Sequence, residues 1–226
     1  MDPLADKYVY NSPYAFSENH VTVHVELEGL EKVYIFDQAE NPDNKRVYTG
    51  RAYVQSKEKG VQGPYRFSSF PNDDSKQNTV KDGTHKFNNK AGHHGGKQKG
   101  LNIVDDKGSR ENTPGTDPSD NDKKMKWVNV HSGVDPENNG GKHNRGSAGC
   151  PTCHPSDAQE FFTNFKFENG NTGSAEGTVT IYRGDSEEAT NTEKTLLFKI
   201  ELQNTELGPI SVPSDATKVN SKPRIP

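Results

Sequence analysis

Cysteine is scarce in this chain, which has only Cys150 and Cys153 among 226 residues. Two cysteines three positions apart cannot cross-link distant parts of a fold, which excludes the disulfide scaffolds of small secreted domains. Long apolar runs are missing as well. No window reaches the roughly 18 apolar residues of a membrane span, and the opening MDPLADKYVY lacks the basic and apolar regions of a signal peptide. The sequence therefore predicts neither a membrane span nor a signal peptide.

Apolar content and charge are both low. Apolar residues make up 28% of the chain, and its net charge is only −4. Low hydrophobicity leads to disorder mainly when it is joined to high net charge, so we expect a compact core with long polar loops. Without a basic block, nothing predicts nucleic-acid binding. We predict an N-terminal segment at 1–19, one domain at 20–203 and a C-terminal tail at 204–226.

Alternation of apolar and polar residues predicts a mostly β fold. HVTVHVELE (20–28), KVYIFD (32–37) and RVYTGRAYV (46–54) are typical of a meander of antiparallel strands. Four further strands are predicted, at 101–106, 126–133, 177–184 and 195–203. The intervening stretch 55–100 is polar and far longer than an ordinary connection. We expect a long loop at about 68–100 that covers the functional site.

One helix is predicted, over SDAQEFFTNFKF (156–167). Ser156 can cap its N-terminus, and Phe161, Phe162 and Phe165 mark an apolar face. We expect these phenylalanines, and the single tryptophan Trp127, to lie in the core.

The segment NVHSGVDPENNGGKHNRGSAGC (129–150) carries the candidate chemistry. A thiol becomes a competent nucleophile when a nearby histidine accepts its proton. His131 and Cys150 flank a glycine-rich loop that can bring them together. Gly149 would let the backbone approach a substrate, and main-chain N–H groups around Cys150 would hold a developing oxyanion.

The segment resembles the catalytic domain of the L,D-transpeptidases, whose signature is a histidine–glycine pair, a variable loop and Ser/Thr-x-Gly-Cys. His131-Ser-Gly133 and Ser147-Ala-Gly-Cys150 match it in order and spacing. The resemblance covers about 20–200 and includes GPYRFSSFPNDDSKQNTVKDGTHKF, LNIV, WVNVHSG and GTVTIYR. It implies a β-sandwich or barrel with one short helix after the cysteine, no cofactor, and a periplasmic or extracellular location.

The resemblance also implies roles for individual residues. Cys150 would attack a carbonyl of a peptidoglycan stem peptide, and His131 would act as base and then as acid. Gly149 and Cys150 would supply oxyanion donors, and Ser147 would orient His131 or its loop. The candidate substrate-binding residues are Gly133, His85, His93 and Arg145. A solvated-loop role remains the alternative for both histidines.

Two positions depart from the family. Many members have histidine where this chain has Ala148, and arginine where it has Thr152. Transpeptidase, carboxypeptidase and endopeptidase activities therefore stay open, as does an inactive relative that binds cell-wall peptide.

Other chemistries compete for the same residues. Cys150-Pro-Thr-Cys153-His154 is a C-x-x-C-H pattern, the attachment motif of c-type haem, although such cytochromes are helical. A C-x-x-C redox pair would require a βαβ context that alternating strands do not supply. A serine hydrolase of the G-x-S-x-G type is excluded, because Arg145 occupies the first glycine position. Zinc is a further alternative, since six histidines lie within seventy residues: His85, His93, His94, His131, His143 and His154.

Overall fold

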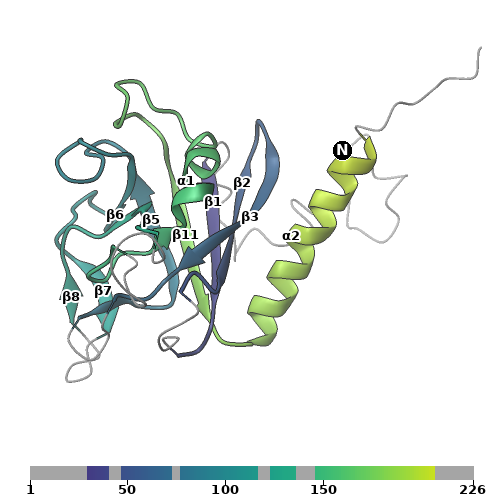
Figure 1. Ribbon diagram of the computed structural model, residues 1–226, viewed down its shortest axis with the longest axis horizontal. Coiled ribbons are helices and arrows are strands. Elements are labelled where there is room, and N and C mark those ends of the chain that lie inside the picture. Colours follow the sequence, from purple (N-terminus) through teal and green to yellow (C-terminus); the bar gives the residue numbers. More distant parts are fainter. Residues whose placement is uncertain (1–29, 41–46, 73–76, 117–122, 136–145, 207–226) are drawn as a thin grey trace, which may run out of the picture.

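The computed structural model describes residues 30–40, 47–72, 77–116, 123–135 and 146–206. Its centre is a closed barrel of eight strands, accompanied by a small three-stranded sheet and two helices (Figure 1). The protein is mostly β, as predicted. In order around the barrel, the strands are β1 (Glu31–Asp37), β11 (Glu176–Arg183), β5 (Gly83–Asn88), β6 (Gly100–Val104), β9 (Asn129–Ser132), β10 (Thr152–Cys153), β3 (Gly60–Ser68) and β2 (Gly50–Ser56). The small sheet contains β4 (Thr79–Val80), β7 (Thr113–Thr116) and β8 (Lys124–Met125).

Strands β1 and β2 pair antiparallel and correspond to the predicted strands at 32–37 and 46–54. Strand β3 continues the antiparallel meander, but it lies in the stretch 55–100, where the sequence predicts no strand. The predicted strands at 101–106, 126–133 and 177–184 correspond to β6, β9 and β11. Two strand pairs are parallel, β1 with β11 and β9 with β10. The predicted strand at 20–28 lies outside the described residues.

The loop expected at about 68–100 is wrong where it contains strands, because β4 and β5 lie within this stretch. In β5 the side chains alternate: His85 and Phe87 are buried, whereas Thr84 and Lys86 are exposed. This alternation is typical of a barrel strand with one face toward the core and the other toward solvent. The segment between β3 and β4 and the connection from β5 to β6 are the parts of the predicted loop that lie near the candidate site.

Helix α1 (Pro155–Phe162) follows the cysteine, as predicted, but starts one residue earlier and ends sooner. Its N-cap is His154 rather than Ser156, since the His154 side chain accepts a hydrogen bond from the Ser156 N–H. A proline at the first helical position suits this start, because the missing N–H would have no helical partner.

The strand predicted at 195–203 is wrong, because these residues belong to α2 (Glu187–Glu206). Ser186 caps this helix through its Oγ, which accepts the Ala189 N–H at 3.0 Å. One helical stripe then meets the barrel: Ala189 and Leu196 are buried, and Gln203 accepts the Val61 N–H at 2.8 Å. The boundary predicted after residue 203 thus falls inside a helix.

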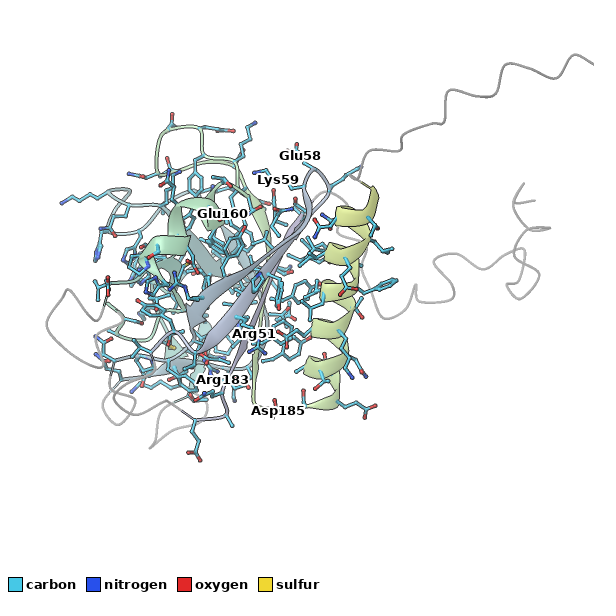
Figure 2. The ribbon with its side chains drawn as sticks, turned by 45° about the vertical axis from the view of Figure 1, so that its right-hand side comes forward. Arg51, Glu58, Lys59, Glu160, Arg183 and Asp185 are labelled. Carbon is cyan, nitrogen blue, oxygen red and sulfur yellow. The ribbon has the colours of Figure 1, made fainter. Side chains whose placement is uncertain are left out.

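Helix α2 stands along β2 and β3, and Figure 2 shows Arg51 on the barrel face that it covers. Arg51 Nε donates to Glu193 at 2.7 Å, which ties the middle of the helix to β2. Within the described ranges, neither helix is long and apolar enough to cross a bilayer.

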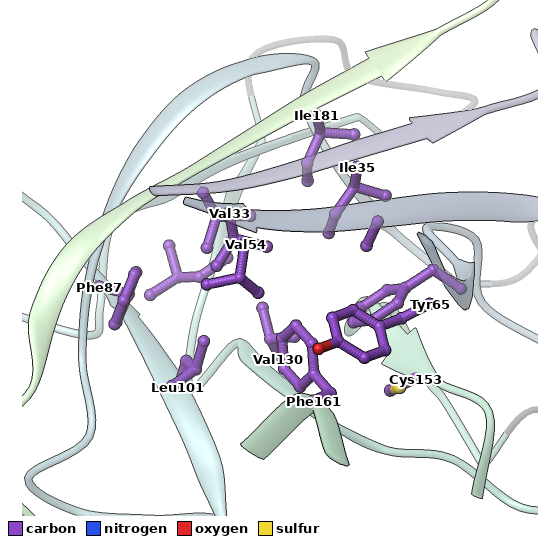
Figure 3. Packing of buried hydrophobic residues seen from close by; sticks show 14 of the residues in the cluster. Val33, Ile35, Val54, Tyr65, Phe87, Leu101, Val130, Cys153, Phe161 and Ile181 are labelled. Carbon is purple, nitrogen blue, oxygen red and sulfur yellow. The ribbon is translucent and has the colours of Figure 1, made fainter. Parts of the chain in front are cut away.

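The core fills the barrel and extends beneath α1 (Figure 3). Phe161 is fully buried, and its ring contacts Tyr65 and Phe67 at centroid distances of 5.5 and 5.1 Å. The predicted aromatic cluster of α1 is therefore core. Trp127 is not, because 58% of its surface is exposed. Its φ of 59° turns the residue out of regular strand geometry just before β9.

Candidate active site

The parallel pair β9 and β10 carries the candidate residues on adjacent strands. His131 is in register with Thr152, and Cys150 lies just before β10. The Asn129 N–H donates to Cys150 Sγ at 3.4 Å. Since side chains alternate along a strand, Asn129 and His131 share one face of β9 while Val130 enters the core. The fold thus brings the predicted histidine, on β9, next to the segment of the predicted cysteine, which leads into the neighbouring strand β10.

His131 is set up to act as a proton acceptor. Its Nδ1 lies 2.7 Å from the Ser132 carbonyl oxygen, which can only accept a hydrogen bond, so Nδ1 carries the proton. In the neutral ring Nε2 is then the basic nitrogen. Burial lowers the pKa of His131 to about 4, so the ring is neutral at pH 7. No hydrogen bond joins His131 to Cys150 in the described part of the chain, a contact that free enzymes often leave loose.

Cys150 is partly exposed, and its thiol is protonated at rest. Burial raises its pKa above the ordinary value, while the Asn129 N–H and the positive charge of Arg110 act in the opposite direction. Because the raising effect is larger, nucleophilic attack from this site requires removal of the thiol proton by a base.

Ser147 organises its own loop rather than His131. Its Oγ donates to the Cys150 carbonyl at 2.6 Å and accepts the Gly149 N–H at 3.0 Å. Asn72 also holds this loop in place, since its N–H donates to the Ser147 carbonyl at 2.9 Å. The hydrogen bonds of its side chain stay within 147–150, and none joins Ser147 to His131 among the described residues.

Gly149 serves the loop in a way the sequence did not reveal. Its φ is +132°, and a Cβ there would lie 2.5 Å from the Asn78 carbonyl oxygen. Glycine is required because the chain itself, not a substrate, approaches this backbone. Its N–H is already bonded to Ser147, so the predicted oxyanion role does not suit Gly149. The Cys150 N–H, which has no partner within the described residues, is the available donor.

His93 belongs to the site, although it lies in the loop between β5 and β6. Its ring stacks on His131 at a centroid distance of 3.9 Å and an interplanar angle of 9°. It is 9% exposed, which rules out the solvated-loop alternative for this residue. Burial, together with His131 and His94 nearby, lowers the pKa of His93 to about 3. His93 is thus a neutral ring that packs against the candidate base, His131.

Asn129 links several groups of the site through hydrogen bonds, and the sequence does not predict this role. Its Oδ1 accepts from Asn102 at 2.6 Å and from Arg110 at 2.7 Å. Its Nδ2 donates to the Trp127 carbonyl at 2.9 Å and lies 3.1 Å from His93 Nδ1. Because the carbonyl only accepts, the amide orientation is fixed and His93 Nδ1 is an acceptor. Its spacing of two from His131 was the signal that could have identified it.

The other predicted substrate-binding residues are scattered. His85 is buried on β5, where its Nε2 lies 2.7 Å from the Lys81 carbonyl oxygen, and no contact joins it to His131 or Cys150. It is neither a cleft residue nor a solvated-loop histidine. Gly133 borders a surface pocket of about 450 Å³ next to α1. Arg145 lies outside the described residues, as does His143.

The geometry disfavours the haem and metal alternatives. Cys153 is fully buried in the core (Figure 3), where a thioether to an external haem would disrupt the packing. His154 caps α1, and its ring packs against Tyr48 at 4.9 Å. Among the described residues, no three His, Cys, Asp or Glu side chains are grouped so that they could hold a metal ion.

Comparisons with known proteins leave the family open: no protein-family model matches the chain, and no curated protein is significantly similar to it.

Proposed function

We propose that this protein is a cysteine acyltransferase or peptidase of the L,D-transpeptidase type that acts on peptidoglycan stem peptides. The observation that carries the proposal is the pairing of β9 with β10, which sets neutral His131 beside the loop of Cys150. The resemblance of His131-Ser-Gly133 and Ser147-Ala-Gly-Cys150 to the family signature supplies the substrate class. Such a substrate implies work in the periplasm or outside the cell.

In the proposed reaction, Cys150 Sγ attacks the carbonyl of the diamino acid at the third position of the stem, and His131 Nε2 takes the thiol proton. The tetrahedral oxyanion accepts a hydrogen bond from the Cys150 N–H. As the C–N bond breaks, His131 returns the proton to the amine of the departing D-amino acid. A thioester on Cys150 remains.

An acceptor amine or water then attacks the thioester, and His131 takes its proton. The C–S bond breaks, and the proton goes to the departing thiolate of Cys150. An amine gives a cross-linked peptide, whereas water gives a shortened one. Neutral His131 suits both steps, because a protonated ring could not accept either proton.

A second candidate is an inactive relative that binds the same peptides. The raised pKa of Cys150 and the absence of a direct bond to His131 in the described part favour it. Alkylation by iodoacetamide separates the two candidates: in an enzyme His131 would make labelling of Cys150 faster than in the His131→Gln variant, and in a binder the two rates would be equal.

The proposal predicts a mass change that depends on Cys150. Purified muropeptides incubated with the protein are expected to lose one D-alanine or to form a cross-linked dimer, as followed by liquid chromatography and mass spectrometry. Cys150→Ala should abolish both products, because it removes the thiol that carries the acyl group.

Cys153→Ala is the matched control, since it removes the other cysteine, which is buried in the core. It should retain the activity with some loss of stability. Unchanged masses with the unmodified chain, or equal conversion by Cys150→Ala, would contradict the proposal.

A further inference from the structure

Helix α2 has a second apolar face, on the side away from the barrel. Its inner stripe, with Ala189 and Leu196, is buried against the barrel. Leu197, Phe198 and Leu202 are nevertheless 42, 59 and 45% exposed, and they are three of the four large apolar side chains that are exposed in the described ranges. A helix that only covers a barrel has polar residues on its outer side. Apolar side chains gathered there indicate a docking surface.

Helical geometry sets this surface opposite the barrel. With 3.6 residues per turn, Phe198 points about 160° away from buried Leu196, and Leu202 lies one turn further along on the side of Phe198. Figure 1 shows α2 along the outside of the barrel, beside β2 and β3. Short, uncharged residues that allow close approach of another helix are exposed on the same side: Asn191, Thr195 and Thr205.

Two opposite charges flank the apolar centre. Lys194 precedes Phe198 by four residues, Glu201 follows it by three, and both are exposed. Seven residues of helix rise about 10 Å, so the two side chains are not the near neighbours that pair three or four positions apart. No ion pair joins either charge to another residue in the described part of the chain. The surface therefore carries one positive and one negative group, each available to a partner.

A second copy in antiparallel orientation matches this pattern. Across a two-fold axis near Phe198, a residue before the axis meets the residue that follows the axis by a similar distance in the other copy. Lys194 then faces Glu201 of the partner subunit, and the contact is made twice. A parallel arrangement would instead set like charges side by side. The order of charges along α2 thus favours an antiparallel pair.

We propose that two copies of this chain associate through α2, with the two helices antiparallel and Phe198 at the two-fold axis. One helix face buries less than the roughly 800 Å² per partner of a standard interface, so the dimer is weak, with a Kd on the order of tens of micromolar. Below that concentration Phe198 contributes nothing to the stability of the single chain. In strand order β9 lies across the barrel from β1, so the candidate site stays open in both copies. The inference does not depend on the proposed function.

Sedimentation equilibrium of the full chain tests the association. Between about 1 and 300 µM, a range that brackets the expected Kd, the mass should rise from 25.0 kDa toward twice that value. Phe198→Glu should leave only monomer, because two unpaired carboxylates would be buried at the axis. Since Phe198 is exposed in the single chain, this variant should keep its fold, which circular dichroism would check.

A charge exchange separates the antiparallel pair from unspecific association. Lys194→Glu and Glu201→Lys should each weaken the dimer about tenfold, because repulsion replaces attraction at two symmetric contacts. The double variant should return to within about twofold of the unmodified chain, because both ion pairs are rebuilt with reversed sign. Lys97→Glu is the matched control: it makes the same change of charge at an exposed position between β5 and β6 and should leave the Kd unchanged.

Three results would overturn the inference. They are a full chain that stays monomeric throughout the range, a dimer that survives Phe198→Glu, and a double variant as weak as the single ones. If another segment of the chain or a different protein covers α2, the first of these results is expected.

Discussion

Replacing His131 by glutamine is expected to slow the turnover of stem peptides by about a thousandfold, within the range for removal of a general base. Glutamine keeps a polar side chain of similar size but cannot take the thiol proton. Because the Cys150 pKa is raised, little thiolate forms at pH 7 without a base. The effect should appear in kcat, with KM changed little, and steady-state kinetics on a defined tetrapeptide would measure it.

His85→Gln is the matched control for this substitution. His85 is also buried but bonds to the Lys81 carbonyl on β5, away from the candidate pair. Its activity should stay within about twofold of the unmodified chain, an ordinary result for a residue outside the site. Comparable losses in the two variants would mean that His131 has only a structural role.

The pKa of His131 should determine the pH below which activity declines. Neutral His131 is the working form, and burial lowers its pKa to about 4 from an ordinary 6.5. As pH falls, kcat/KM should therefore hold through pH 5.5 and decline only near pH 4. A decline centred at 6.5 would indicate a solvated histidine and contradict the geometry.

Replacing Phe161 by alanine is expected to lower the free energy of unfolding by about 3–5 kcal/mol, as for other buried phenylalanines. The ring is fully buried and contacts four others, those of Tyr65, Phe67, Phe162 and Phe165. Its loss opens a cavity between α1 and the barrel. Urea denaturation followed by circular dichroism would show a lower midpoint with an unchanged slope.

Phe198→Ala on α2 gives the comparison, because 59% of Phe198 is exposed. It should change stability by no more than about 0.5 kcal/mol. A loss below about 1 kcal/mol in Phe161→Ala would show that this cluster is not the packed centre that joins helix to barrel.

Strands that alternate cleanly could be predicted from the sequence, and those hidden in polar composition could not. GTVTIYRG and KVYIFD form β11 and β1, in which Val33, Ile35, Val179 and Ile181 alternate into the barrel core. GTHKFN falls within the predicted loop because its only apolar inward residue is Phe87. The composition of TLLFKIELQ predicts a strand, although Ser186 and the stripe of Ala189, Leu196 and Gln203 have helical spacing.

The candidate pair of Cys150 and His131 was predictable from the motif, but its surroundings were not. Their supports come from distant segments: His93 from the β5–β6 connection, Arg110 from the β6–β7 connection and Asn72 from the segment after β3. Local pattern carries no information about such tertiary contacts. The histidine count likewise could not separate His93, which stacks on the base, from His85, which does not.

The central claim is that Cys150 carries the acyl group, and the most direct measurement is the intact mass of the protein during turnover. Stem tetrapeptide would be mixed with the unmodified chain, quenched in acid within seconds and analysed by mass spectrometry with peptide mapping. We predict a mass increase over the unmodified chain equal to the mass of the tetrapeptide less that of D-alanine, located on Cys150 and released by hydroxylamine. An unmodified Cys150 while product accumulates would contradict the account.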